Sequence, residues 1–169
     1  MLIAVSDSHC REDPQLTSHL QQAIRDSDCT VHLGDFTTPA VLDAFKAHSN
    51  RLIAVAGNRD TEAVKKRLGE TATVDWGGRR FLLTHGHRRG PTALSLLARQ
   101  EAADVVLSGH SHRPVIDRLD DRLHVNPGSY ADPRGNQPAY ARFQPANGSM
   151  VVTLMTPTGE EVETSRFPG

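Results

Sequence analysis

Short runs of β-prone apolar residues alternate with helix-compatible segments over the first two-thirds of this sequence. Leu16, Leu20 and Ile24 recur at helical spacing, so the segment that carries them would bury one face. Strands that alternate with helices in this way predict an α/β fold around a largely parallel sheet. The expected strands are residues 2–5, 30–33, 52–56, 80–83 and 104–107, and the expected helices are residues 14–27, 39–48, 61–68 and 91–103.

Two parts of the chain depart from this alternation. Gly77 and Gly78 separate two β-prone runs directly, which predicts a hairpin within residues 73–83. From Pro114 onward, only turn-forming residues such as Asn147 and Gly148 separate the runs. We expect an antiparallel meander there, and one arrangement for it is a second sheet stacked on the first. Its runs are residues 115–119, 123–125, 139–143, 150–156 and 162–167.

Composition restricts the class of protein. A chain of 169 residues with 37% hydrophobic content predicts a single domain over residues 1–169. The net charge is −1, whereas a protein that coats nucleic acid would normally be basic. No run approaches the roughly 18 apolar residues of a membrane span, so we expect no membrane association. Cys10 and Cys29 form neither a CxxC motif nor a disulfide framework, which makes the cytoplasm the expected location.

Polar and ionisable residues follow five of the expected strands, each just past the carboxyl end. Because open α/β sheets bind ligands at that edge, these side chains would meet at one rim. Adjoining glycines, such as Gly34 and Gly57, would let the backbone turn sharply there. The residues are Asp7, His9, Asp35, Asn58, His85, His87, His110 and His112.

This set contains two carboxylates, one carboxamide and several imidazoles. It has more nitrogen and oxygen donors than one tetrahedral ion takes. It suits two cations about 3.5–4 Å apart that share a carboxylate and a solvent oxygen. Any one motif alone is more often a capped strand end or a turn than a metal site. Their common position after successive strands makes polar loops without metal the weaker interpretation.

The motifs, taken in order, resemble those of the calcineurin-like metallophosphoesterase superfamily. The match is nearer to its small bacterial and archaeal phosphodiesterases and covers residues 1 to about 134. It implies a two-sheet β-sandwich flanked by helices, in the order α/β/β/α. The motifs are Asp7-x-His9, Gly34-Asp35, Gly57-Asn58-Arg59-Asp60, His85-Gly86-His87, Gly109-His110-Ser111-His112, and Asn126-Pro127-Gly128-Ser129 followed by Pro133-Arg134.

The resemblance also implies ligands and an activity. Asp35 would bridge two divalent metal ions, and a hydroxide between them would attack a phosphate ester in line, most simply a phosphodiester. Manganese is the first expectation for the metal, while mixed nitrogen and oxygen ligands also accept iron, cobalt, nickel or zinc. One ion would be held by Asp7, His9, Asp35 and His112, and the other by Asp35, Asn58, His85 and His110.

Arg59 marks a departure from the larger members of that superfamily, which carry a histidine after Gly-Asn that is thought to protonate the leaving group. The pKa of an arginine exceeds about 12, so Arg59 cannot donate that proton. We assign catalytic roles to Asn58, to Arg59 as a phosphate contact, and to His87 as a phosphate contact or proton donor. The alternatives are an ion pair of Arg59 with Asp60 or with another carboxylate outside the pocket, and a His87 that orients His85 or is merely solvated.

The sequence also predicts structural roles for two further residues. His32, inside an expected strand, would be a hydrogen-bonded core histidine. Asp60 would orient its neighbours or cap the helix that opens at Thr61.

Two other functions stay open. A eukaryotic trafficking-complex subunit resembles this fold and works as an interaction scaffold, but a scaffold needs none of the ligand types retained here. A nuclease acting on short oligonucleotides is the second; the charge and the 5% aromatic content disfavour an extended nucleic-acid surface. The expected partner is a small phosphodiester or nucleotide-like substrate. Neither the natural substrate nor the oligomeric state, including a homo-oligomer, follows from the sequence.

Overall fold

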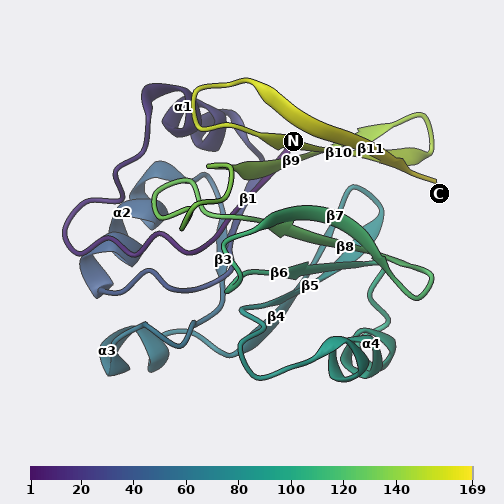
Figure 1. Ribbon diagram of the computed structural model, residues 1–169, viewed down its shortest axis with the longest axis horizontal. Coiled ribbons are helices and arrows are strands. Elements are labelled where there is room, and N and C mark those ends of the chain that lie inside the picture. The colour runs from purple at the N-terminus through teal and green to yellow at the C-terminus, as the bar shows by residue number, and fades with distance from the viewer. Residues whose placement is uncertain (169) are drawn as a thin grey trace.

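Two mixed β-sheets face one another in the computed structural model, which describes residues 1–168 (Figure 1). The six-stranded sheet has the order β11-β10-β9-β1-β2-β3, and the five-stranded sheet has the order β4-β5-β6-β8-β7. The strands of the first sheet are β1 (Leu2–Val5), β2 (Cys29–His32), β3 (Leu52–Ala54), β9 (Tyr140–Ala146), β10 (Ser149–Met155) and β11 (Glu161–Phe167). Those of the second are β4 (Thr71–Trp76), β5 (Arg79–Thr84), β6 (Val105–Ser108), β7 (Pro114–Leu119) and β8 (Arg122–Pro127).

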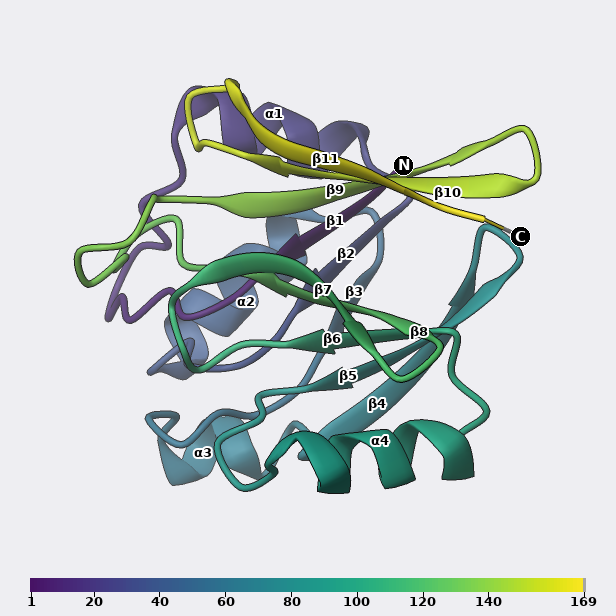
Figure 2. The same cartoon turned by 45° about the vertical axis from the view of Figure 1, so that its right-hand side comes forward.

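Four helices cover the outer faces of the two sheets. Figure 2 shows α4 along the outer side of the five-stranded sheet, while α1 and α2 lie against the other sheet. The helices are α1 (Ser18–Asp26), α2 (Pro39–His48), α3 (Glu62–Lys65) and α4 (Pro91–Gln100). No helix within residues 1–168 is both long and apolar enough to cross a membrane.

Side chains of β1 show how the layers are held together. Leu2 and Ala4 lie in the core between the sheets, whereas Ile3 and Val5 pack against α1 and α2. This alternation is the period of a strand that is buried on both faces. Phe81 of β5 and Phe143 of β9 meet edge to face across the interior, with ring centroids 5.4 Å apart. The predicted helix-flanked two-sheet sandwich is therefore confirmed.

The second half of the chain does not form a sheet of its own, so that arrangement of the meander is wrong. Strands β7 and β8 extend one sheet, and β9 to β11 extend the other. Strand β8 pairs in parallel with β6, and β9 pairs antiparallel to β1. The expectation of one largely parallel sheet fails for the same reason, since three parallel strands lie in each sheet. The edges of β1 and β6 carry backbone groups that need partners, and the late strands supply them.

The helix boundaries differ from the prediction in α1, α3 and α4, and the helix expected over residues 91–103 ends at Gln100. The helix expected from residue 14 begins at Ser18, because Gln15 has a left-handed φ of 53° and the Thr17 side chain accepts from the Leu20 N–H as the N-cap. The helix expected over 61–68 is α3, which is shorter. The chain just beyond it returns to the β3 end, where Ala56 N donates to Gly69 O at 2.8 Å. The Gly77-Gly78 hairpin is confirmed as the β4–β5 turn.

His32 is the fully buried core histidine that the sequence predicted. Gly34 N donates to its Nδ1 at 3.2 Å, so the ring proton lies on Nε2, which is 2.6 Å from Ser8 Oγ. The ring stacks on Phe36 with centroids 3.6 Å apart. Burial disfavours its charged form and lowers its pKa to about 3.

The pKa of His32 predicts a pH-dependent stability. Between pH 6.5 and about 3 the unfolded chain binds this proton and the folded chain does not, so stability falls as the pH is lowered through this range. The contribution is at most about 1.4 kcal/mol per pH unit. Urea unfolding of metal-free protein at pH 7 and pH 5 should therefore show a larger loss for wild type than for His32→Gln. Equal losses in the two proteins would contradict this origin.

Candidate metal centre

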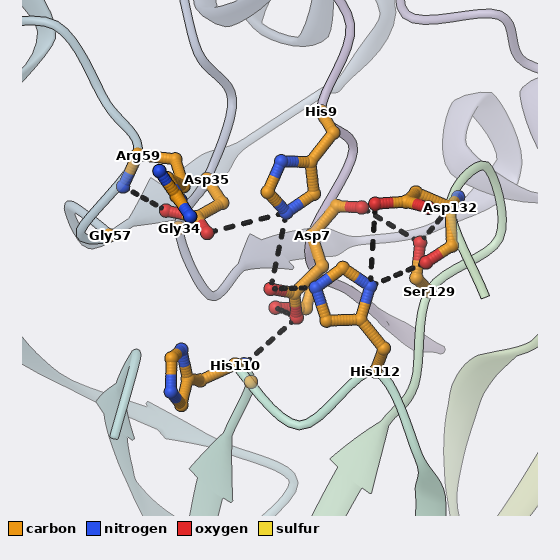
Figure 3. Close-up of polar contacts among 12 residues, drawn as sticks. Asp7, His9, Gly34, Asp35, Gly57, Arg59, His110, His112, Ser129 and Asp132 are labelled. Atoms are coloured by element: carbon orange, nitrogen blue, oxygen red, sulfur yellow. Dashed lines mark hydrogen bonds and ion pairs between the residues drawn. The ribbon is translucent and has the colours of Figure 1, made fainter. Parts of the chain in front are cut away.

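The predicted ligand residues gather where strands of both sheets end (Figure 3). Several hydrogen bonds join the loops of the two sheets at this rim, including one from a candidate ligand directly after β5 and one from a candidate ligand directly after β6. His85, after β5, donates from Nδ1 to Leu33 O at 2.7 Å, just past β2. His110 follows β6, and its backbone N–H donates at 2.9 Å to Oδ2 of Asp7, which follows β1. The centre therefore spans the sandwich rather than belonging to one sheet.

Asp7 is completely buried, and its two oxygens have different surroundings. Oδ2 accepts hydrogen bonds from Ser6 Oγ at 2.6 Å and from the backbone of His110. Oδ1 is buried without a hydrogen-bond partner among residues 1–168. It faces His112 Nε2 at 3.4 Å and His9 Nε2 at 3.9 Å. Burial opposes ionisation of Asp7, but the neighbouring imidazoles and Ser6 outweigh it and lower its pKa.

Asp35 lies between two imidazoles. Its Oδ2 is 3.3 Å from His9 Nε2 and 3.3 Å from His85 Nε2. Its Oδ1 accepts from the Arg59 backbone N–H at 2.7 Å, which fixes the orientation of the carboxylate. Burial raises its pKa, but contacts with His85 and the Arg59 N–H outweigh this and lower the pKa to about 2. Asp35 is thus an ionised acceptor at neutral pH.

Two histidines present Nε2 to the centre because their Nδ1 atoms are occupied. Leu33 O is an acceptor only, so His85 Nδ1 carries a proton and its Nε2 faces Asn58 Oδ1 at 3.0 Å. His112 Nδ1 is held in the same way by the carbonyl of Asp132. This arrangement is typical of metal-binding histidines, whose second nitrogen donates to an oxygen. Burial lowers the pKa of His85, but the carboxylates of Asp35 and Asp7 raise it by more, so the net shift is upward. The centre therefore favours positive charge.

Backbone strain is concentrated on these residues, which the sequence did not predict. Five candidate ligands have positive φ angles: Asp7 (54°), His9 (49°), Asp35 (59°), His110 (70°) and His112 (58°). Left-handed backbone at a non-glycine residue costs roughly 1–3 kcal/mol and persists only where the surroundings hold it. The strained backbone therefore lowers the stability of the fold while it directs these side chains toward the centre.

Glycines help at the same rim for two reasons. Gly34 has a φ of 95°, as the expected sharp turn requires. At Gly57 and Gly109, neighbouring side chains leave no room for a larger residue. A Cβ at these positions would lie 2.2 Å from Asp35 Oδ1 and 2.0 Å from Ser6 Oγ, respectively.

The remaining predicted site residues lie at the edge of the centre. The exposed His110 ring is 5.2 Å from that of His85, centroid to centroid, and the partly buried His87 ring is 5.3 Å from it. Burial and the charge of His85 lower the pKa of both His87 and His110. The Arg59 side chain is exposed, while its backbone serves Asp35.

Asp60 orients its neighbours and does not cap α3, whose N-cap is Thr61. Its oxygens accept from Gly57 N at 2.7 Å, Thr37 N at 2.7 Å and Asp35 N at 3.1 Å. An ion pair between Arg59 and Asp60 does not occur in the described part of the chain.

Sequence reasoning missed three groups that hold the ligands in place. Ser6 fixes Asp7, and Asp132 fixes His112. Asn126 Nδ2 donates to Gly109 O at 2.7 Å and so fixes the His110–His112 segment. Asn126 belongs to the Asn126-Pro127-Gly128-Ser129 motif, but nothing local indicates where its amide would bind.

The donor set fits divalent cations. An unpartnered buried oxygen such as Asp7 Oδ1 costs about 1–3 kcal/mol unless a ligand satisfies it. Its neighbours supply imidazole and carboxylate donors, the mixture that first-row transition metals accept. The ligand atoms form two groups, each within 4.8 Å: Asp7, His9 and His112, and Asp7, Asp35 and His85.

Comparison with known proteins agrees with this geometry. The profile of the calcineurin-like phosphoesterase superfamily domain matches residues 1–148. The chain belongs to the calcineurin-like phosphoesterase superfamily. Membership makes it a phosphoric ester hydrolase by class and confirms the family that the motifs resembled. Divalent metal ions are implied for this fold, as its metallophosphoesterase relatives indicate.

Two relatives and one structural neighbour illustrate the match. A probable metallophosphoesterase of Methanothermobacter thermautotrophicus is 35% identical over 151 residues, which are 82% of this chain and 83% of that protein. The structure of the Escherichia coli phosphoesterase YfcE has a TM-score of 0.74 at 25% identity and covers 97% of both chains. Vps29 of Entamoeba histolytica with bound zinc has a TM-score of 0.78 at 18% identity, covering 98% of this chain and 97% of that one. The last likeness shows the fold alone.

Metal binding should stabilise the folded protein. Adding Mn²⁺ to chelator-treated protein should raise the free energy of unfolding by about 2.7 kcal/mol at roughly 100 times the dissociation constant. Asp35→Asn should lose most of this gain, whereas Asp43→Asn, which removes an exposed carboxylate paired with Arg67, should keep it. Acidification should reduce the gain, because protons compete for the ligating imidazoles. Thermal unfolding with and without metal checks this; an equal gain in Asp35→Asn would exclude a central role for Asp35.

Proposed function

We propose that this chain is a phosphodiesterase that acts with two divalent metal ions bridged by Asp35. The observation that carries the proposal is the position of Asp35 Oδ2, 3.3 Å from both His9 Nε2 and His85 Nε2. These imidazoles belong to two different predicted ligand sets, so a single oxygen of Asp35 contacts one member of each set. The sets are Asp7, His9, Asp35 and His112 for one ion, and Asp35, Asn58, His85 and His110 for the other. Manganese is the first ion to test, followed by iron, cobalt, nickel and zinc.

When bound, two such cations neutralise charge on the phosphoryl oxygens and lower the pKa of water so that it can attack phosphorus in line. The chain contributes position and fixed charge, which dominate phosphoryl-transfer catalysis. Leu33 O and Asp132 O hold His85 and His112 with Nε2 facing the centre. The Arg59 N–H holds Asp35.

A cavity of about 440 Å³ opens beside the centre and would receive one ester group of the substrate. Its charged walls pair with one another: Lys65 lies 3.3 Å from Glu62, and Arg88 lies 2.6 Å from Glu70. Balanced charge and this size suit a small polar group, as in a small phosphodiester or nucleotide-like substrate. The lining residues are Ala56, Gly57, Asn58, Glu62, Lys65, Leu68, Glu70, His87 and Arg88.

The scaffold alternative has support from the fold alone, through the likeness to Vps29. A scaffold does not require Asp7 to be buried with an unpartnered oxygen facing imidazoles, whereas a metal-dependent hydrolase does. The nuclease alternative shares the proposed chemistry and differs only in the size of the substrate. We also expect the protein to act in the cytoplasm.

Hydrolysis should depend on metal and on Asp35. Exhaustive chelation should abolish cleavage of bis(p-nitrophenyl) phosphate, and Mn²⁺ should restore it. Asp35→Asn should be among the most damaging single changes, because the bridging position serves both ions, and Asp43→Asn should retain activity. The release of nitrophenolate measures each rate. Full activity of the metal-free protein would exclude the metal mechanism, and a metal-binding but inactive wild type would favour the scaffold.

Arg59 should affect substrate choice. Because Arg59 cannot protonate a departing alkoxide, aryl diesters should react far faster than alkyl diesters, with a steep dependence on leaving-group pKa. A charge-assisted hydrogen bond to phosphate is worth roughly 1.5–3 kcal/mol, so Arg59→Ala should lower kcat/KM by about 10- to 150-fold. Arg67→Ala, which removes an exposed arginine paired with Asp43, is the matched control.

Steady-state kinetics over a series of diesters and monoesters would separate the roles. An unchanged kcat/KM in Arg59→Ala would exclude the phosphate contact. Rates of wild type that are independent of the leaving group, under conditions where chemistry limits, would indicate another proton donor. His87→Gln would then test the nearest candidate.

A further inference from the structure

The segment between β8 and β9, residues 128–139, closes one side of the metal centre, and we call it the β8–β9 loop. Figure 3 shows two of its residues, Ser129 and Asp132, beside Asp7 and His112. Ser129 Oγ donates to Asp7 O at 2.7 Å and accepts from Asp132 N at 2.8 Å. His112 Nδ1 donates to Asp132 O. The loop is therefore fastened to two residues of the candidate ligand set.

Arg134 is held in an uncommon conformation on this loop. Its φ is 49°, and that of the next residue, Gly135, is 82°. A non-glycine residue at positive φ is uncommon and persists where surrounding contacts maintain it. One such contact is the hydrogen bond from Arg134 Nε to Asp132 Oδ2 at 3.1 Å. Asp132 thus positions the Arg134 guanidinium and also holds His112.

The other side of this guanidinium borders the centre. Arg134 Nη2 lies 3.5 Å from His9 Nε2, which is itself 3.3 Å from Asp35 Oδ2. A guanidinium has five N–H donors, and Asp132 occupies one of them. If His9 binds a cation through Nε2, its lone pair is no longer available to Arg134. The Nη2 donors are then free for an oxyanion at the edge of the centre.

We propose that Arg134 forms a phosphate subsite by donating to a non-bridging oxygen of the substrate. The planar fork of arginine matches phosphate oxygens, and the bond to Asp132 orients that fork before substrate binds. This subsite rests on the proposed phosphodiesterase function and adds a second guanidinium, on the His9 side, to the contact proposed for Arg59.

Binding of inorganic phosphate to Mn²⁺-saturated protein tests the subsite without relying on turnover. Isothermal titration calorimetry should show a dissociation constant about tenfold or more higher for Arg134→Ala than for wild type, because a charge-assisted contact is lost. Arg134→Gln should be similarly weakened, since it can still donate to Asp132 but carries no charge. Both variants should retain wild-type Mn²⁺ affinity and melting temperature.

Arg80→Ala is the matched control. Arg80 Nε donates to Asp75 Oδ1 at 2.8 Å, and its side chain is 45% exposed, against 51% for Arg134, but it lies on the β4–β5 hairpin. Its phosphate affinity should equal that of wild type.

The outcomes separate this inference from the function on which it rests. If Arg134 only fastens the loop, Arg134→Ala should lose stability and Mn²⁺ affinity, Arg134→Gln should restore both, and phosphate affinity at saturating Mn²⁺ should stay at the wild-type value in Arg134→Gln. That result overturns the subsite alone, and it is decisive even if Arg134→Ala fails to fold. A wild-type protein that binds Mn²⁺ but not phosphate would overturn both the subsite and the proposed function.

Discussion

Two carboxylates are buried at one rim of the sandwich, and the surrounding loops are arranged to compensate their charge. Asp7 is fully buried and Asp35 is 2% exposed, and contacts with imidazoles and N–H groups lower the pKa of each. Buried charge is costly unless it is paired or bound to metal. Donors from Ser6, from the His110 backbone and from the Arg59 backbone account for one oxygen of each carboxylate. The other two oxygens face imidazoles and favour cations.

The sandwich creates this concentration of charge. In each sheet a group of parallel strands ends at the same edge, and the two edges meet because apolar side chains such as Phe81 and Phe143 join the sheets. The bond from His85 to Leu33 then ties one sheet's loops to the other's. Packing of the core and geometry of the centre are consequently coupled, so a shift between the sheets would also change the distances between ligands.

Local strain and distant support complete the centre. Left-handed backbone at the candidate ligands costs stability. The Asp60 carboxylate accepts from the Gly57 N–H and Asn126 Nδ2 donates to Gly109 O, and these hydrogen bonds maintain the loops that carry the strained residues. A phosphoesterase depends on such positioning, because charge placed in advance around the phosphoryl group does most of the catalytic work. The β8–β9 loop extends the same principle to the substrate side, with Asp132 supporting both His112 and Arg134.

Three features could be predicted from the residue pattern alone: the order of strands and helices, the β4–β5 hairpin, and the position of each candidate ligand after a strand. These features follow from periodicity and turn residues, which act over a few neighbouring positions. The sequence also carries the motifs by which the superfamily is identified. Predicted helix boundaries were less accurate where the conformation of one residue sets the start of the helix, as the left-handed Gln15 does before α1.

In contrast, the sheet that each late strand joins and the groups that meet at the centre depend on how the whole chain packs. Strand β8 pairs with β6 as well as with the adjacent β7, and β9 pairs with the distant β1, because the backbone groups on these strand edges need partners. The contact of Asp7 Oδ1 with His112 and the approach of Arg134 to His9 likewise depend on loops from distant segments. The pairing of β1 with β9 and the approach of Arg134 to His9 join residues more than a hundred positions apart, and no local pattern encodes them.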